Sequence, residues 1–213
     1  MTTLEPKRPS AMRSTRSPLG DASWHYVEAS SLDAFTAADW ALLDRQRAPF
    51  YARHQANEVL RMLAASADDP VFGYCINNYR HCLQAASMAL RDGGDDETVV
   101  VALLHDIGFV ACPATHGAFA AALLAAYIEE RHHWMLLHHQ AFQSFHCSTH
   151  PDCNPTERER WRGHPHFAWT ARFVERYDQN AIDPGYDTLP LSTFEPMVRR
   201  LFERPMHVAA DIV

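Results

Sequence analysis

Apolar residues recur every three or four positions through most of the chain, the spacing that places them on one face of an α-helix. We expect helices over residues 36–49, 50–65, 75–90, 97–108, 116–131, 133–146, 157–161, 165–180 and 191–202. Pro49 is expected to break the chain between the first two of these helices, and the segment from Asp92 to Asp95 is expected to form a turn. No two segments show the alternation of a paired β-strand. The pattern therefore predicts an all-α fold.

Two polar residues interrupt the most apolar of these expected helices, at 97–108. His105 and Asp106 directly follow the run from Val99 to Leu104. Burying an imidazole and a carboxylate costs free energy unless the two groups pair or bind a metal ion. Neighbouring helical residues diverge by about 100°. Such a pair therefore suits two adjacent ions better than one.

More histidines occupy apolar positions of the neighbouring helices. The chain has 14 His, and histidine is the commonest metal ligand as well as a frequent acid–base group. The candidates are His81, His116, His138 and His139, and Asp178 lies near the end of the helix expected at 165–180. The sequence thus offers a series of potential ligands, one or two on each successive helix.

In this order the residues resemble the HD-domain superfamily of metal-dependent phosphohydrolases and oxygenases. The resemblance rests on the Ala-Leu-Leu-His-Asp-Ile-Gly segment at 102–108, on His81 with Leu83-Gln84, on His116-Gly117, and on Arg176-Tyr177-Asp178. It covers about residues 73–202. The chain is most similar to the mixed-valent di-iron oxygenases, the group of myo-inositol oxygenase and the phosphonate-cleaving oxygenases.

The resemblance implies an HD-domain helical bundle with a dinuclear metal site in its core. His81, His105, Asp106 and Asp178 would hold one iron ion, and Asp106, His116 and His139 would hold the other, with Asp106 as the bridging carboxylate. His139 is preferred to His138 because the similar motif reads His-x-x-Phe-Gln, which matches residues 139–143. Four imidazoles and two carboxylates also suit Mn, Mg or Zn.

The function that the resemblance implies is an O2-dependent oxidation that cleaves a C–C or C–P bond at a hydroxyl-bearing carbon of a small polar substrate. The alternative is a metal-dependent phosphohydrolase acting on a nucleotide or phosphate ester, because the same ligands support both reactions. A non-catalytic metal-binding module is a third possibility, which the complete ligand set disfavours. Besides Asp106, Tyr74, Arg80 and Arg162 are candidate catalytic or substrate-binding residues.

The chain also departs from the family. Some members carry a lysine after the His-Asp-x-Gly motif, where this chain has Phe109, and the sole lysine is Lys7. The phosphonate enzymes carry a Tyr and a Glu ahead of the first histidine, where this chain has Val71 and Tyr74. The identity of the substrate therefore does not carry over.

Composition narrows the partners and the location. The net charge of −7 disfavours nucleic-acid binding, and no apolar run is long enough for a transmembrane helix. Five cysteines without a CxxC pair favour reduced thiols in a cytoplasmic protein. We expect a weakly ordered leader at 1–30 and a single domain at 31–213 with a helical extension at about 31–70.

Two smaller expectations concern the remaining histidines. His146, Cys147, His150 and Cys153 form a polar cluster that a surface loop explains better than a structural zinc site. His132 and His133 are expected to lie at a solvated helix start.

Overall fold

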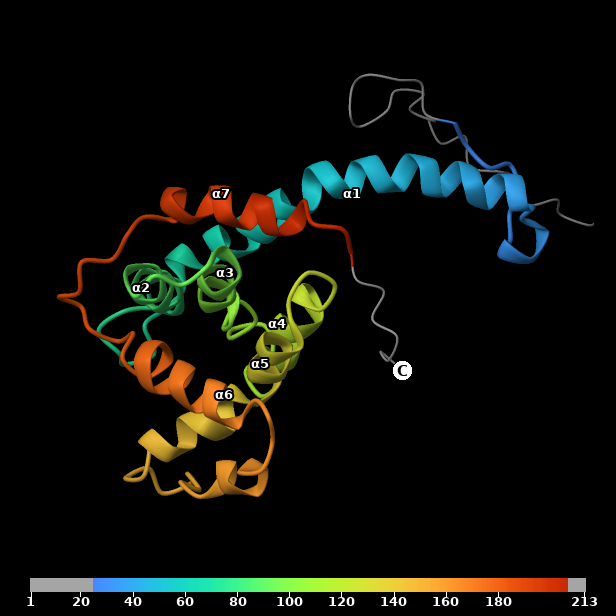
Figure 1. Cartoon of the computed structure of the whole chain (residues 1–213). Coiled ribbons are helices and arrows are strands. Elements are labelled where there is room, and N and C mark those ends of the chain that lie inside the picture. The colour runs from blue at the N-terminus through green and yellow to red at the C-terminus, as the bar shows by residue number, and fades with distance from the viewer. Residues whose placement is uncertain (1–24, 207–213) are drawn as a thin grey trace, which may run out of the picture. The chain divides into compact units, whose positions relative to one another are not determined.

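The computed structural model describes residues 25–206, which contain seven α-helices and no β-strand (Figure 1). This confirms the all-α prediction. The α-helices are α1 (Ala37–Ala65), α2 (Asn78–Arg91), α3 (Asp96–Leu104), α4 (His116–Leu124), α5 (Glu130–Gln143), α6 (Phe167–Phe173) and α7 (Leu191–Phe202). Shorter helical turns are η1 (Leu32–Ala34), η2 (Ser66–Asp68), η3 (Ser144–His146), η4 (Glu157–Trp161) and the π-helical η5 (Val174–Asp178). Within this part of the chain, none of the helices is long and apolar enough to span a bilayer.

The described residues divide into two compact units between Gln55 and Ala56. The first contains η1 and the beginning of α1, where the Thr36 hydroxyl accepts from the backbone N–H of Asp39 and the Asp39 carboxylate accepts from the backbone N–H of Thr36. These reciprocal bonds form a capping box. Most of the expected leader, residues 1–24, lies outside the described residues.

The break expected at Pro49 is wrong, because α1, which is 29 residues long, continues through this proline. A proline inside a helix costs about 3 kcal/mol, chiefly through one lost hydrogen bond and a clash within a single turn. The turns on either side are rich in Ala, Leu, Arg and Gln, which favour the helical state. The summed helix propensity of these residues offsets the cost of the proline, so the helix continues through it.

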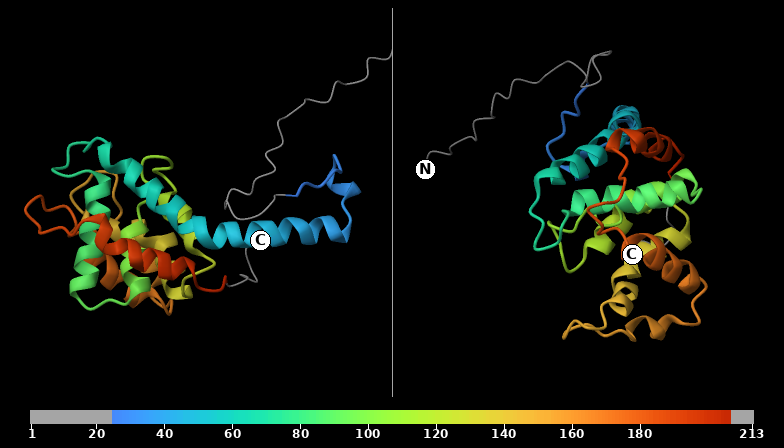
Figure 2. Two further views of the ribbon diagram at one scale, coloured as in Figure 1. Left: turned by 90° about the horizontal axis from the view of Figure 1, so that it is seen from above. Right: turned by 90° about the vertical axis from the view of Figure 1, so that its left-hand side faces the viewer.

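The second unit is built around α3. Every residue from Glu97 to Leu104 is buried, as expected for a helix that is apolar on all sides. Helices α2 and α7 pack on α3, while α5 packs on α4 and α6 (Figures 1 and 2). The predicted helix at 97–108 is therefore a central buried helix, but a shorter one.

Several predicted helix ends differ from the observed ones. After Leu104 the chain leaves the α-helix through i→i+3 hydrogen bonds, from the N–H of Ile107 to Leu104 and from that of Phe109 to Asp106. Helix α4 ends at Leu124, short of the expected 131. The helix expected at 165–180 is divided into α6 and the wider π-helical turn η5.

The expected solvation of His132 is also wrong. Its ring is fully buried, and its Nδ1 donates to the Glu97 carboxylate at 2.7 Å. Glu97 further accepts from the backbone N–H of Glu129 and from the Arg204 guanidinium. This network connects α3 with α5 and with the chain just after α7.

Candidate metal centre

Six buried side chains from five parts of the second unit converge in its core. They are His81 of α2, His105 and Asp106 after α3, His116 at the start of α4, His139 of α5 and Asp178 of η5. Three overlapping triples have ligand atoms within 4.8 Å of one another: His81–His105–Asp106, His105–His139–Asp178 and Asp106–His116–His139. The core of the described chain thus contains groups that can hold a metal ion.

Local capping fixes the first of these ligands. Asn77 caps α2 by accepting the N–H of Arg80 at 3.0 Å, and its own amide donates to the backbone oxygen of Ala67. His81 therefore lies in the first turns of a helix whose start is held in place. The next residue along, Asn78, donates to the backbone oxygen of Asp106 at 2.9 Å, which connects the start of α2 with the end of α3.

The adjacent residues His105 and Asp106 both reach the cluster from the end of α3, which lies between Leu104 and His105. The i→i+3 turns that follow accompany an Asp106 carboxylate that lies beside His116 and His139. The Nε2 of His105 is 3.7 Å from Oδ1 of Asp106. Neighbours in sequence thus serve one cluster.

All four histidines of the cluster are oriented in the same way. Each ring faces a backbone carbonyl with Nδ1, at 2.8 to 3.0 Å, and turns Nε2 inward. The carbonyl partners are those of Ala181, Ala102, Pro113 and Leu136. A carbonyl only accepts, so each Nδ1 carries a hydrogen, and a ring in its neutral form presents an Nε2 lone pair to the cluster. Metal-binding histidines use this second hydrogen bond to fix the tautomer.

The inward lone pairs meet in two couples. The Nε2 atoms of His81 and His105 are 3.1 Å apart, and those of His116 and His139 are also 3.1 Å apart. Two lone pairs at this distance repel each other unless a proton or a metal ion lies between them. Ligand atoms about 2.1 Å from one ion are about 3.0 Å apart on an octahedron and about 3.4 Å apart on a tetrahedron. The observed spacings are those of ligands around a metal ion.

The Asp106 carboxylate lies between the two couples. Its Oδ1 is 3.0 Å from His116 Nε2 and 3.2 Å from His139 Nε2. Its Oδ2 is 3.6 Å from His81 Nε2. Its Oδ1 is also 3.7 Å from His105 Nε2, so one carboxylate faces both imidazole couples.

Asp178 completes the side of His81 and His105. Its Oδ1 lies 3.7 Å from the Nε2 of each and accepts from the Gln143 amide at 3.0 Å. Its Oδ2 is buried and has no hydrogen-bond partner among the described residues. An orphaned carboxylate oxygen in the core is costly, and a bound cation would satisfy it. The donor set therefore fits a metal ion.

A glycine permits the close approach of α4 and α5. A Cβ at Gly117 would lie 2.4 Å from the backbone oxygen of Leu136 and 3.0 Å from the His139 ring. Only glycine therefore lets His116, at the start of α4, reach His139. The sequence singled out Gly117 through its motif, but the steric reason is visible only in the structure.

Burial and the neighbouring charged groups shift the pKa values of the side chains in the cluster. Burial alone would lower the pKa of His105, but the carboxylates of Asp106 and Asp178 outweigh it and raise that pKa to about 9. Burial would raise the pKa of Asp106, yet His105, His116 and His139 hold it well below its usual range. The pKa of His81 is lowered, first by burial and then by His105. Two carboxylates thus carry negative charge in the core, which favours a cation.

Other predicted site residues lie apart from the cluster. The His138 ring packs against Trp134 and Trp161 rather than Asp106. Tyr74 is exposed, the Arg80 guanidinium donates to the backbone oxygens of Pro184 and Tyr186, and Arg162 pairs with Glu159. Their proposed roles in catalysis remain predictions. Of the loop cluster, Cys147 and Cys153 are free thiols, and no metal-binding triple forms there among the described residues.

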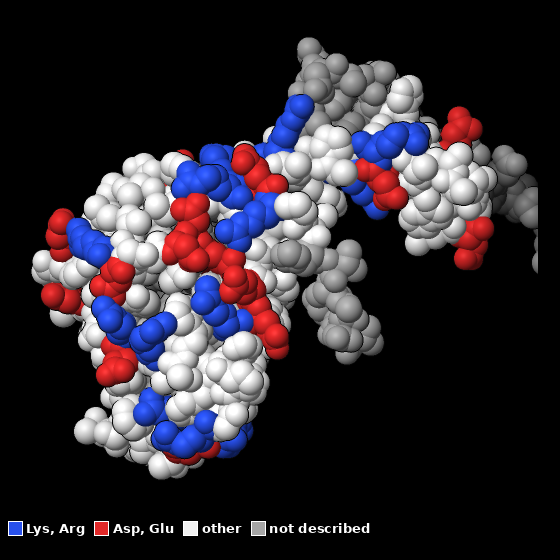
Figure 3. All heavy atoms as spheres, in the orientation of Figure 1, with Lys and Arg blue, Asp and Glu red and all other residues white. Residues whose placement is uncertain are grey.

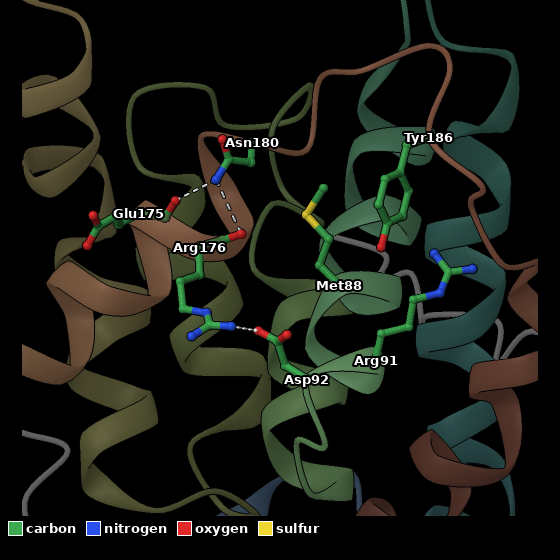
Figure 4. A pocket seen from close by; sticks show the side chains of 7 residues that line it. All are labelled: Met88, Arg91, Asp92, Glu175, Arg176, Asn180 and Tyr186. Atoms are coloured by element: carbon green, nitrogen blue, oxygen red, sulfur yellow. Dashed lines mark hydrogen bonds and ion pairs between the residues drawn. The ribbon is translucent and has the colours of Figure 1, made fainter.

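A separate polar pocket of about 350 Å³ lies at the far end of α2 (Figure 4). Arg176 and Arg91 point into it, but each is already paired, with Asp92 and Asp187 respectively. Arg176 lies in η5 on the outer side, whereas Asp178 of the same turn is fully buried. The pocket is therefore distinct from the metal centre. Acidic and basic groups are likewise interspersed over the face shown in Figure 3.

Sequence reasoning missed the residues that hold the ligands in place. Asn78 and Gln143 donate hydrogen bonds to Asp106 and Asp178, respectively. Gln143 belongs to the His-x-x-Phe-Gln motif, so its place in that motif was the available signal. Asn78 gave no such signal in the sequence, because its hydrogen bond to the backbone oxygen of Asp106 depends on where α3 ends.

The sequence matches no known family, and a search of curated proteins finds no similar sequence. The class that the fold and the cluster define is an all-helical protein with a buried histidine and aspartate site able to bind metal.

Proposed function

We propose that the chain is a dinuclear non-haem iron oxygenase that uses O2 to oxidise and cleave a C–C or C–P bond at a hydroxyl-bearing carbon. The observation that carries the proposal is the position of the Asp106 carboxylate between the His81–His105 and His116–His139 couples. In the proposed site, one ion is held by His81, His105, Asp106 and Asp178, and the other is held by Asp106, His116 and His139. The resemblance to HD-domain oxygenases supports iron as the metal.

The two ions would together supply activation of O2 and of the substrate hydroxyl. The overall reaction is R–CH(OH)–X + O2 → R–COOH + X–OH, where X is carbon or phosphorus. The C–H and C–X bonds break, one oxygen atom enters each product, and O2 accepts all four electrons. No other reductant is required.

The protein's own residues hold the ligands in the orientation that metal binding requires. The backbone carbonyls that accept from the four Nδ1–H groups fix the rings with Nε2 inward. Gln143 orients the Asp178 carboxylate. The surrounding core, including the fully buried Phe173 against His105, excludes bulk water from the His105 side of the site.

One observation favours the oxygenase over the phosphohydrolase. Among the described residues, the hydrogen bonds and ion pairs of the cluster involve only His, Asp, Asn, Gln and backbone groups. Arg80, a candidate anion clamp, is engaged by two backbone carbonyls. A phosphate ester would therefore have to be held by the ions alone, and so would a phosphonate, which leaves cleavage of a C–C bond as the oxidation that this observation favours.

Metal analysis of protein purified without oxygen, with EPR after partial oxidation, tests the proposal. We expect two irons per chain and a coupled Fe(II)/Fe(III) signal. O2 uptake should then follow the addition of a hydroxylated substrate. Bound Mn, Mg or Zn without that signal after iron reconstitution, together with oxygen-independent turnover of phosphate esters, would contradict it and establish the hydrolase.

A further inference from the structure

A strained turn lies at the surface near the metal centre. In the turn from Val71 to Tyr74, the N–H of Tyr74 donates to the backbone oxygen of Val71 at 2.9 Å. Both central residues have positive φ, 51° at Phe72 and 99° at Gly73. Turns of this kind normally take Asn-Gly or Gly-Gly. A phenylalanine in the left-handed region is an outlier.

Burial does not account for this phenylalanine, because 63% of Phe72 is exposed. The conformation is unfavourable for a residue with a large side chain, and an exposed aromatic ring gains little from packing to offset it. Strained residues of this kind concentrate at functional sites. The exposed ring therefore calls for a functional explanation.

A line of rings connects Phe72 with a cluster ligand. The Phe72 ring packs edge-to-face on Phe109, with centroids 6.4 Å apart, and Phe109 in turn contacts the ring of His116 at 5.5 Å. The neighbours Val71, Tyr74 and Val110 are exposed by 44%, 60% and 48%. We call these five residues the aromatic rim: Val71, Phe72, Tyr74, Phe109 and Val110.

The rim is uncharged as well as apolar. The two segments that supply it, residues 70–78 and 107–117, contain no Asp, Glu, Lys or Arg. In the family that the chain resembles, the position of Phe109 can hold a lysine. The approach to His116 is therefore suited to hydrocarbon rather than to an anionic group.

We propose that the aromatic rim binds an apolar chain or ring of the substrate while the substrate's oxygen atoms reach the metal ions beside His116. This inference rests on the proposed function and narrows its substrate to an amphiphilic hydroxylated molecule. Phe72 is then a specificity-determining residue, and the strain of its turn is retained because it holds the ring against Phe109.

Hydroxamates test the inference, since they chelate metal ions through two oxygen atoms and carry a variable tail. We would titrate acetohydroxamate and octanohydroxamate into the iron-loaded protein by calorimetry. Each buried methylene adds up to about a fourfold gain in affinity. Octanohydroxamate should therefore bind at least about tenfold more tightly than acetohydroxamate even if the tail is only partly buried.

Variants of the aromatic rim test whether Phe72 is responsible for the tighter binding of octanohydroxamate. Phe72→Asn removes the ring but suits the positive φ, so the turn should persist. The affinity for octanohydroxamate relative to that for acetohydroxamate should fall to about threefold or less, while the affinity for acetohydroxamate itself stays unchanged. Phe72→Leu should retain most of the ratio. Phe145→Asn is the matched control, because Phe145 is also exposed but contacts Arg158; it should leave the ratio intact.

The outcomes separate this inference from the proposed function. Equal affinity for the two hydroxamates, or a ratio unaffected by Phe72→Asn, overturns the role of the rim and leaves the metal centre standing. Failure to bind any metal overturns the proposed function and the rim's role with it.

Discussion

At the scale of single residues, the structure distinguishes clearly between the adjacent histidines His138 and His139 as candidate metal ligands. His139 presents Nε2 to Asp106 at 3.2 Å, whereas His138 packs on Trp134 and Trp161. We predict that His139→Ala loses at least one metal ion per chain, while His138→Ala retains the wild-type content. Elemental analysis of the two purified variants checks this. Equal loss in both would contradict the assignment.

Gly117 yields a second prediction at this scale. In Gly117→Ala the new methyl would lie 2.4 Å from the backbone oxygen of Leu136, so α4 has to shift away from α5. We expect a loss of about 1–3 kcal/mol in the free energy of unfolding, typical of overpacking, together with weaker metal binding. Urea denaturation and metal titration measure the two effects.

The control for that substitution is Gly163→Ala, because a methyl there would meet nothing within 4 Å. It should leave both the stability and the metal affinity unchanged. A similar loss in the two variants would show that the Gly117 contact is not the cause.

At the scale of elements, the Glu97 carboxylate connects α3 with α5 and with the chain just after α7. Burial would raise its pKa, but the bonds from His132, the Glu129 N–H and Arg204 outweigh burial and lower it to about 2 from 4.5. A depressed carboxylate pKa stabilises the fold fully above 4.5, and this contribution is lost as the pH falls towards 2.

We therefore predict that Glu97→Gln lowers the free energy of unfolding at pH 7 by about 3 kcal/mol. The difference from the wild type should shrink as the pH falls from 4.5 to 2. Urea denaturation over that pH range measures it. Glu175→Gln is the control, since Glu175 is exposed, and it should follow the wild type. A difference for Glu97→Gln that does not vary with pH would contradict the linkage.

Element types were predictable from the sequence, but element ends were not. The apolar period indicated α2, α3 and α7, and the bounds of α7 were as expected, Leu191–Phe202. Periodicity carries no signal for the i→i+3 turn after Leu104 or for the π-helical turn that carries Asp178. Asp106 and Asp178 of the cluster lie at those two departures from the α-helix.

At the scale of the whole molecule, a bound ion would stabilise the fold by satisfying the Nε2 couples and the Asp178 Oδ2. We predict that chelation lowers the melting temperature of the metal-loaded protein by about 5–10 °C, as expected for removing a ligand present at about 100 times its Kd. Differential scanning calorimetry before and after chelation, with metal added back as the control, measures this. An unchanged melting temperature would contradict a metal in the core.

The candidate site was largely visible in the sequence as a set of residues and not as a geometry. His81, His105, Asp106, His116, His139 and Asp178 were named, and the structure brings all six together. What the sequence could not reveal was the shared orientation of the rings. That orientation depends on four backbone carbonyls, and a carbonyl's position carries no signature in residue identity.

The spread of the ligands along the chain has a consequence for how the protein matures during translation. Asp106, His116 and His139 lie within one stretch of the sequence, so this part of the cluster can close as soon as α5 has left the ribosome. Asp178 emerges only after α6 and η5. In the proposed dinuclear site, metal would thus be acquired in two stages, with the Asp106–His116–His139 group assembled first and the His81–His105 side completed last.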